Sequence, residues 1–166
     1  MRSTTFVSLR GLLVLMAVLA LLRPAAAQKY VPFRAAFSGI GIADASRFPV
    51  LKIDITGGGN ATHLGRFTTA QSHFINVFDP SGAFTGGTYT FTAANGDTIY
   101  GSYSGVFLPV DEGRFSINGA FTIEGGTGRF AGATGGGDAS GILNPDGTSD
   151  VLLQGIISTV GSGKRK

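Results

Sequence analysis

The sequence lacks cysteine and tryptophan, and it holds few charged residues. Only 14% of its 166 residues are charged, against about 25% in an average protein. The absence of cysteine excludes a disulfide scaffold, a thiolate zinc site and a thiol nucleophile. Glycine is abundant, with 27 residues, and 43% of the chain is hydrophobic. The chain therefore has enough apolar material to form a core, which argues against disorder.

The N-terminal segment predicts a secretory signal peptide over residues 1–27. A basic start precedes a 12-residue apolar run at 11–22, and three alanines follow at 25–27. Small residues of this kind are accepted by signal peptidase. The run is short for a membrane span of about 30 Å. We expect cleavage after Ala27, no stable membrane anchor, and a secreted or periplasmic protein. An uncleaved anchor is the alternative.

Removal of this leader leaves a chain of balanced charge. Of the 13 basic residues, three (Arg2, Arg10 and Arg23) lie in the leader, so ten remain against the ten acidic residues. Three of those ten form the end of the chain at 164–166. No basic patch is left elsewhere, and we expect no nucleic-acid partner. We predict one domain over residues 28–160 and a disordered basic tail at 161–166.

Hydrophobic residues recur at every second position through most of the domain. Between residues 114 and 124, Phe115, Ile117, Phe121 and Ile123 fall on one face. No stretch after the leader shows a helical period. Alternation of this kind is typical of half-buried strands. We predict eight or nine strands, at about 30–39, 49–56, 60–69, 72–78, 84–94, 97–107, 114–124, 135–143 and 148–158.

Turn residues separate these strands. Asn95-Gly96 is typical of a type I′ hairpin, and 79–82 and 144–147 combine proline with glycine at turn positions. Gly57–Gly59 is predicted to end a strand. The even spacing predicts an all-β fold, a closed antiparallel β-barrel of eight strands (up to nine), with a sandwich as the alternative. Such a barrel is filled by side chains or holds one small ligand.

Glycines also occur inside the predicted strands. Gly101, Gly105 and Gly119 are expected at bends of the closing barrel or where another backbone approaches closely.

A ligand site inside the barrel would combine apolar walls with a few polar groups. Tyrosine hydroxyls and arginine side chains are the candidates, together with an aromatic residue expected to plug the interior. The candidate ligand-binding residues are Tyr89, Tyr100, Tyr103, Arg114, Arg129 and Phe130. In the alternative interpretation the tyrosine rings only cover the sheet, and both arginines lie at strand ends in water.

We predict no metal site and no cofactor. His63 and His73 are the only histidines, and a metal site would require the fold to bring them together with Asp54 or Asp79. Residues 126–131 fit the pattern G-x-G-x-x-A of dinucleotide-binding loops. That pattern works only at the start of a helix, and the glycines that follow are unsuited to one.

Residues 125–135 read GGTGRFAGATG. Together with the hairpin at Asn95-Gly96, this stretch resembles the dirigent proteins and allene oxide cyclases and similar proteins secreted by bacteria. The resemblance covers about Thr88–Ile157. It implies an eight-stranded barrel, often trimeric, whose lumen holds an apolar molecule. In those enzymes polar lumen residues steer a reactive intermediate. Their catalytic residues have no position-by-position match here, so the activity does not transfer with the fold.

These observations favour a secreted barrel that binds a small apolar ligand or a protein partner. The first alternative is an isomerase, cyclase or dirigent-type protein. The second is a small outer-membrane barrel, because strands of about ten residues are long enough to span. Residues 151–153 and 156–157 are apolar on both faces of the last strand, which predicts a homo-oligomer, with a trimer as one form.

Overall fold

The computed structural model describes residues 29–158. The predicted signal peptide, its cleavage site and the basic tail lie outside the described residues. No α-helix occurs in residues 29–158, which form strands and one 3-10 turn. In chain order these elements are β1 Tyr30–Asp44, β2 Val50–Ala61, β3 Gly65–Asn76, β4 Ala83–Ala93, β5 Thr98–Pro109, β6 Phe115–Ile123, β7 Gly125–Gly126, η1 Gly128–Phe130, β8 Gly135–Leu143 and β9 Thr148–Ser158.

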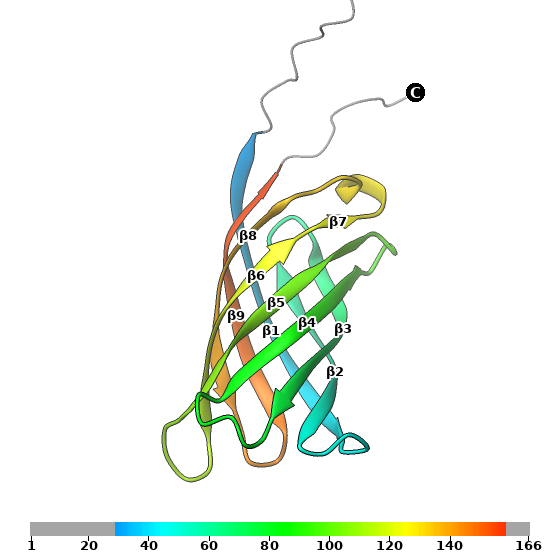
Figure 1. Cartoon of the computed structure of the whole chain (residues 1–166). Coiled ribbons are helices and arrows are strands. Elements are labelled where there is room, and N and C mark those ends of the chain that lie inside the picture. The colour runs from blue at the N-terminus through cyan, green and yellow to red at the C-terminus, as the bar shows by residue number, and fades with distance from the viewer. Residues whose placement is uncertain (1–28, 159–166) are drawn as a thin grey trace, which may run out of the picture.

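Eight of these strands close into an antiparallel barrel, as predicted (Figure 1). Neighbouring strands pair in the order β4-β3-β2-β1-β9-β8-β6-β5, and β5 pairs with β4 to complete the circle. The short β7 pairs with the start of β5, beyond the end of β6. Closure leaves the barrel without the long unpaired edges that favour aggregation.

The predicted end of a strand at Gly57–Gly59 is wrong. These glycines lie inside β2, where Gly57 pairs with Gly39 of β1 and Thr69 of β3. A β-carbon at Gly59 would come within 2.6 Å of the Cβ of Phe37, so the glycines serve close strand approach. The chain turns instead at residues 62–64. The predicted strands 60–69 and 72–78 consequently merge into β3, which gives eight barrel strands.

The hairpin between β4 and β5 lies where Asn95-Gly96 predicts it, but its turn is of another kind. A type I′ turn needs positive φ at both central residues. Here only Gly96 has positive φ, at 85°. The Gly96 N–H donates to the Ala93 carbonyl, and the Ala93 N–H donates to the Asp97 carbonyl. The loop between Ala93 and Asp97 has three residues and ends on a left-handed glycine, which is a common hairpin connection.

Aromatic rings cover inward-facing glycines on the neighbouring strand. Across β4 and β5, Phe84 lies opposite Gly105 and Tyr89 opposite Gly101. A bulge at Gly86, whose φ is 62°, adds one residue to β4 between these two pairs. The bulge lets both Phe84 and Tyr89 face inward although their numbers differ in parity. A β-carbon added at Gly101 or Gly105 would also clash with a backbone oxygen of β6, which confirms that both glycines lie where another backbone approaches closely.

The two ends of the barrel differ in packing. The closed end carries both chain ends of the described segment, the β2–β3 and β4–β5 turns and η1 (Figure 1). Rings of Phe67 and Phe91 stack there at 4.3 Å, and Phe37 packs edge-on against both. Leu64 and Phe130 join the same buried cluster. The open end carries the loops β1–β2, β3–β4, β5–β6 and β8–β9 (Figure 1). Side chains toward this end enclose a cavity.

Candidate functional site

A cavity of about 270 Å³ occupies the half of the barrel toward the open end. Phe37, Phe91 and Phe121 form its floor, above the packed aromatic cluster. Ala43, which is exposed, lies at its rim. Protein interiors are normally packed as densely as organic crystals. A cavity of this size approaches the roughly 300–1,000 Å³ of small-molecule sites.

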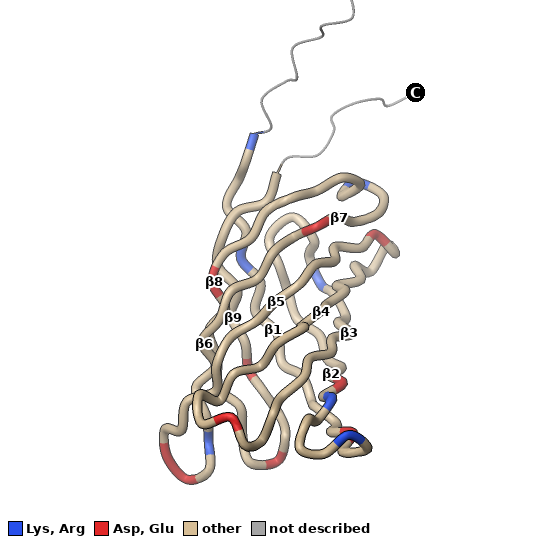
Figure 2. Tube along the Cα trace, viewed as in Figure 1, with Lys and Arg blue, Asp and Glu red and all other residues tan. Residues whose placement is uncertain are grey.

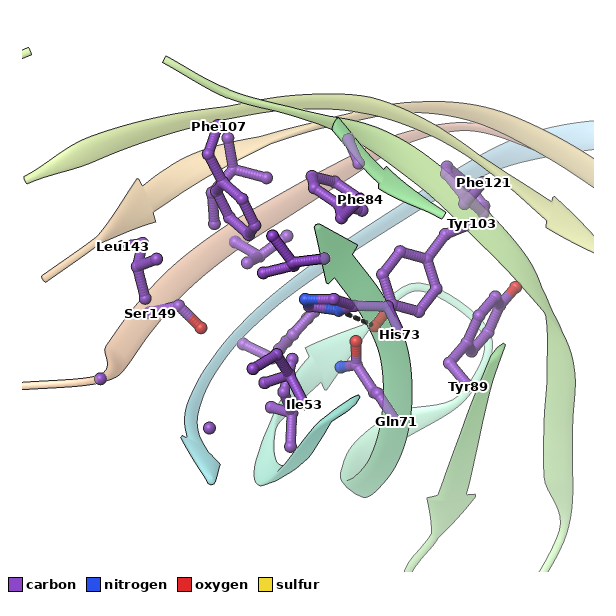
Figure 3. Close-up of a pocket in the computed structure, with 18 of the residues that line it drawn as sticks. Ile53, Gln71, His73, Phe84, Tyr89, Tyr103, Phe107, Phe121, Leu143 and Ser149 are labelled. Carbon is purple, nitrogen blue, oxygen red and sulfur yellow. Dashed lines mark hydrogen bonds between the residues drawn. The ribbon is translucent and has the colours of Figure 1, made fainter. Parts of the chain in front are cut away.

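The wall of the cavity is mostly apolar. Among the residues that the structure describes, no lysine, arginine, aspartate or glutamate lines it. Aliphatic and aromatic side chains come from every barrel strand, and Figure 3 shows many of them around the polar groups. The polar side chains in the wall are Gln71, His73, Tyr89, Tyr103 and Ser149. An apolar wall with a few polar groups is the usual composition of a small-ligand site.

His73 on β3 is the most deeply buried titratable group in this wall. His73 is only 3% exposed to solvent. The Nδ1 atom is hydrogen-bonded to the Tyr103 hydroxyl at 2.8 Å. Rings of Phe84, Tyr103 and Phe107 surround the imidazole, with centroids 5.2 to 6.0 Å away. Figure 3 shows this pair at the centre of the cavity wall.

Burial controls the protonation of this pair. Loss of water contact lowers the pKa of His73 to about 4, because a charged imidazole in an apolar site is poorly solvated. Burial likewise raises the pKa of Tyr103 well above its usual value. Within residues 29–158, no charged side chain lines the cavity to offset either effect. Both side chains are therefore neutral at pH 7.

Tyr89 is held by the barrel wall. Its hydroxyl donates to the Thr122 carbonyl at 2.8 Å. At this point the pairing of β5 with β7 is shifted by one residue from its pairing with β6. Burial and then the negative charge of Glu124 raise the pKa of Tyr89 well above its usual value. The ring is a fixed part of the wall.

Gln71 and His73 each place a nitrogen in the interior without a protein partner. The Nε2 atoms of both side chains are buried and accept or donate no hydrogen bond within the described residues. The Ser149 hydroxyl comes from β9, and Ser149 is 8% exposed. Figure 3 shows the Ser149 oxygen and the His73 ring facing one another across the cavity. Sequence reasoning missed Gln71 and Ser149 and considered His73 only as a metal ligand.

The structure brings only two of the predicted ligand-binding residues to the cavity, Tyr89 and Tyr103. Tyr100 faces outward and is 43% exposed. Arg114 lies before β6, where its guanidinium binds both carboxylate oxygens of Asp111 at 2.8 Å. Tyr100 lies outside the lumen because it occupies an outward-facing position of β5. Arg114 lies outside it because it belongs to the loop between β5 and β6.

Arg129 and Phe130 belong to the closed end. Phe130 is 4% exposed and packs into the core cluster, so it plugs the barrel away from the cavity. The Arg129 guanidinium lies 5.0 Å from the Phe130 ring centroid. It donates to the Leu64 carbonyl at 3.3 Å and pairs with Asp97 at 3.6 Å. Arg129 therefore connects three turns that close this end.

The two histidines lie in different environments. His63 occupies the β2–β3 turn with a φ of 65°, and its Nε2 is 3.0 Å from the Pro32 carbonyl oxygen. His73 lies inside the barrel further along β3. Within residues 29–158, no three histidine, aspartate or glutamate side chains cluster as metal ligands do.

Apolar side chains surround the open end. Phe48 and Phe78 are 62% and 71% exposed and contact each other edge-on at 5.5 Å. Val77, Leu108 and Val110 are exposed on the neighbouring loops and strand ends. Figure 2 shows most charged residues near the two ends of the barrel and few along its wall. Within residues 29–158, no helix is long and apolar enough to cross a membrane.

Comparisons with known proteins identify no relative. No family model matches the sequence, and neither curated proteins nor solved structures give a match.

Proposed function

We propose that the barrel binds one small, mostly apolar molecule in its lumen, through the open end. The cavity of about 270 Å³ is the observation that carries this proposal. The same barrel is densely packed with phenylalanine at its closed end, so its sequence is able to fill a lumen. Large apolar voids are rare in native proteins because they forfeit dispersion contacts. A ligand would restore those contacts.

The proposal is tested by adding a ring inside the lumen and an identical ring outside. Ala139 lines the cavity, whereas its neighbour Ser140 is exposed on the outer face of β8. We expect Ala139→Phe to reduce binding of a neutral apolar fluorescent dye by more than tenfold, since the added ring fills ligand space. Ser140→Phe is expected to leave the dye affinity within twofold of the natural protein. Dye fluorescence measures both, and equal affinities in all three proteins would refute lumen binding.

A cyclase- or dirigent-type activity is the second candidate. The His73–Tyr103 pair favours it, because two hydrogen-bonded polar side chains meet in a deep apolar lumen. The resemblance of residues 125–135 to that family supports the same candidate. In this case native mass spectrometry of protein from its own host would detect a retained substrate or product. His73→Gln would then abolish turnover and keep binding.

Export and self-association complete the proposal. The leader supports secretion or residence in a periplasm. The outward-facing threonines on β4 favour a barrel whose outer wall faces water over one whose outer wall faces lipid. On β9, Ile156 is 47% exposed and Leu152 half-buried on the outer face. An outer face of this kind supports a homo-oligomeric contact.

The oligomer is tested with Ile156→Asp. We expect the mature protein to scatter light as an oligomer at micromolar concentration and the variant to dissociate, because a buried unpaired carboxylate is costly. Ser104→Asp, at an exposed position on the outer face of β5, is the matched charge control. A natural protein that is monomeric at this concentration would contradict the proposed contact.

A further inference from the structure

Three polar side chains lie in a row on the inward face of β3, in a lumen whose walls are mostly apolar. On β3, Thr69, Gln71 and His73 follow one another on the inward face, and each has a buried side-chain atom without a hydrogen-bond partner in the described residues. Gln71 and His73 line the cavity. Buried polar atoms are almost always paired, because leaving one unpaired is unfavourable. Two such atoms side by side at a cavity indicate a recognition element.

The hydrogen-bond network determines which His73 nitrogen carries the proton. If the Tyr103 hydroxyl donates to Nδ1, the neutral imidazole carries its proton on Nε2, and only that N–H lacks a partner. If Nδ1 donates to Tyr103 instead, both the hydroxyl proton and the Nε2 lone pair lack partners. The first arrangement leaves fewer unpaired groups. His73 therefore presents an N–H donor toward the lumen.

The Gln71 amide presents further donors beside it. Its Nε2 carries two N–H groups and has no partner within the described residues. Figure 3 shows the Gln71 amide next to the His73–Tyr103 pair on the same wall. The Ser149 hydroxyl on the opposite wall has a proton to donate as well. The described part of the chain thus provides the lumen with hydrogen-bond donors and no cationic group.

We propose that the ligand carries an uncharged carbonyl oxygen, as in a ketone, aldehyde or ester, which accepts hydrogen bonds from Gln71 and His73. This inference rests on the proposed ligand binding in the lumen. A carbonyl oxygen has two lone pairs and no proton of its own, so it suits two N–H donors on the same wall. A carboxylate would enter a lumen with no lysine or arginine to pair with it, and burial of an unpaired charge is strongly unfavourable.

Three probes of one shape separate these alternatives. 2-Acetylnaphthalene carries the carbonyl, 2-isopropylnaphthalene replaces it with a hydrocarbon, and 2-naphthoate carries a carboxylate. Affinities are measured at pH 7 by displacement of the neutral fluorescent dye. We expect 2-naphthoate to bind at least roughly tenfold more weakly than the ketone, since its charge must be desolvated.

Gln71→Leu tests the carbonyl contact directly. We expect roughly a tenfold loss in affinity for 2-acetylnaphthalene and no loss for 2-isopropylnaphthalene, because only the ketone loses a hydrogen bond. Thr69→Val is the matched control: Thr69 lies on the same inward face of β3 but outside the cavity wall. In this control both affinities should stay unchanged. The carbonyl stretching band of the bound ketone should also lie at lower frequency in the natural protein than in Gln71→Leu.

The outcomes distinguish the two proposals. If the hydrocarbon and the ketone both bind and Gln71→Leu weakens neither, the carbonyl inference is wrong and lumen binding stands. If 2-naphthoate binds as tightly as the ketone, the inference is likewise overturned. If the dye binds equally to the natural protein and to Ala139→Phe and no probe displaces it, the proposed function itself fails.

Discussion

Replacing Gly105 with valine is expected to destabilise the barrel by at least about 3 kcal/mol. A β-carbon at this inward position would lie 2.6 Å from Cζ of Phe84 and 2.7 Å from the Gly119 Cα. Carbon atoms in contact normally lie about 3.5–4.0 Å apart. The Gly119 contact is to backbone, so the strands β5 and β6 would have to separate. Urea denaturation followed by circular dichroism measures the loss.

Ser104→Val is the control for this prediction. Ser104 is the exposed neighbour of Gly105 on β5, and valine is a favourable strand residue. We expect its free energy of unfolding to change by less than about 1 kcal/mol. A Gly105→Val protein as stable as Ser104→Val would show that the close packing of β5 against β4 and β6 is wrong.

The free energy of unfolding is expected to fall by about 3 kcal/mol between pH 6.5 and pH 4 because of His73. The pKa of this side chain is lowered from 6.5 to about 4 in the folded protein. Between these values the unfolded chain binds a proton that the folded chain does not, and this stabilises the unfolded state. The contribution of neutral His73 to the free energy of unfolding is fully present above about pH 6.5. It decreases as the pH falls and stops changing below about pH 4. One pKa unit corresponds to about 1.4 kcal/mol.

His73→Gln and His63→Gln separate this effect from other titrations. The first variant should lose the decrease between pH 6.5 and pH 4, whereas the second should keep it, because His63 is exposed in a turn. The carboxyl groups of Asp79 and Asp146 take up protons at lower pH than this range. Hydrogen bonds from Ser81 and Thr148, respectively, hold the pKa of each below 3.8. A pH dependence that survives in His73→Gln would show that His73 is not buried in neutral form.

The barrel is predictable from the sequence because the core and the turns leave local signals. The alternation at 114–124 places Phe121 and Ile123 inside, where both are buried. Proline and glycine at 79–82 and 144–147 mark real loops, and Gly82 and Gly147 have positive φ. These signals depend on neighbouring residues alone.

The errors arise where a residue's role depends on a strand far away in the sequence. Gly57–Gly59 resembles a turn locally, yet these glycines are needed because Phe37 and Phe67 lie on the adjoining strands. The true turn contains His63 in a left-handed conformation that residues other than glycine seldom adopt. Local sequence therefore gave no warning of it.

The candidate site is predictable from the sequence only in part, because the inward face can be assigned only in strands that the sequence reveals. Tyr89 and Tyr103 were found because aromatic residues in the inward phase of a strand face the lumen. Gln71 was missed because it fell in the gap between two predicted strands. With β3 taken as one strand, the alternation of Phe67, Gln71 and His73 would have placed both polar residues inside. Ser149 is the second residue of β9, and so close to a turn the sequence alone does not show which face of the strand points inward.

The central claim is that a neutral apolar ligand occupies the lumen, and methyl NMR during titration with 2-acetylnaphthalene tests it most directly. Interior methyl groups of Ile53, Ile117 and Leu153 line the cavity, whereas Ile42 and Ile156 are exposed outside it. We expect saturable shifts at the interior methyls and none at the two exterior ones. Shifts confined to Ile42 or Ile156, or no shifts at saturating ketone, would contradict the account.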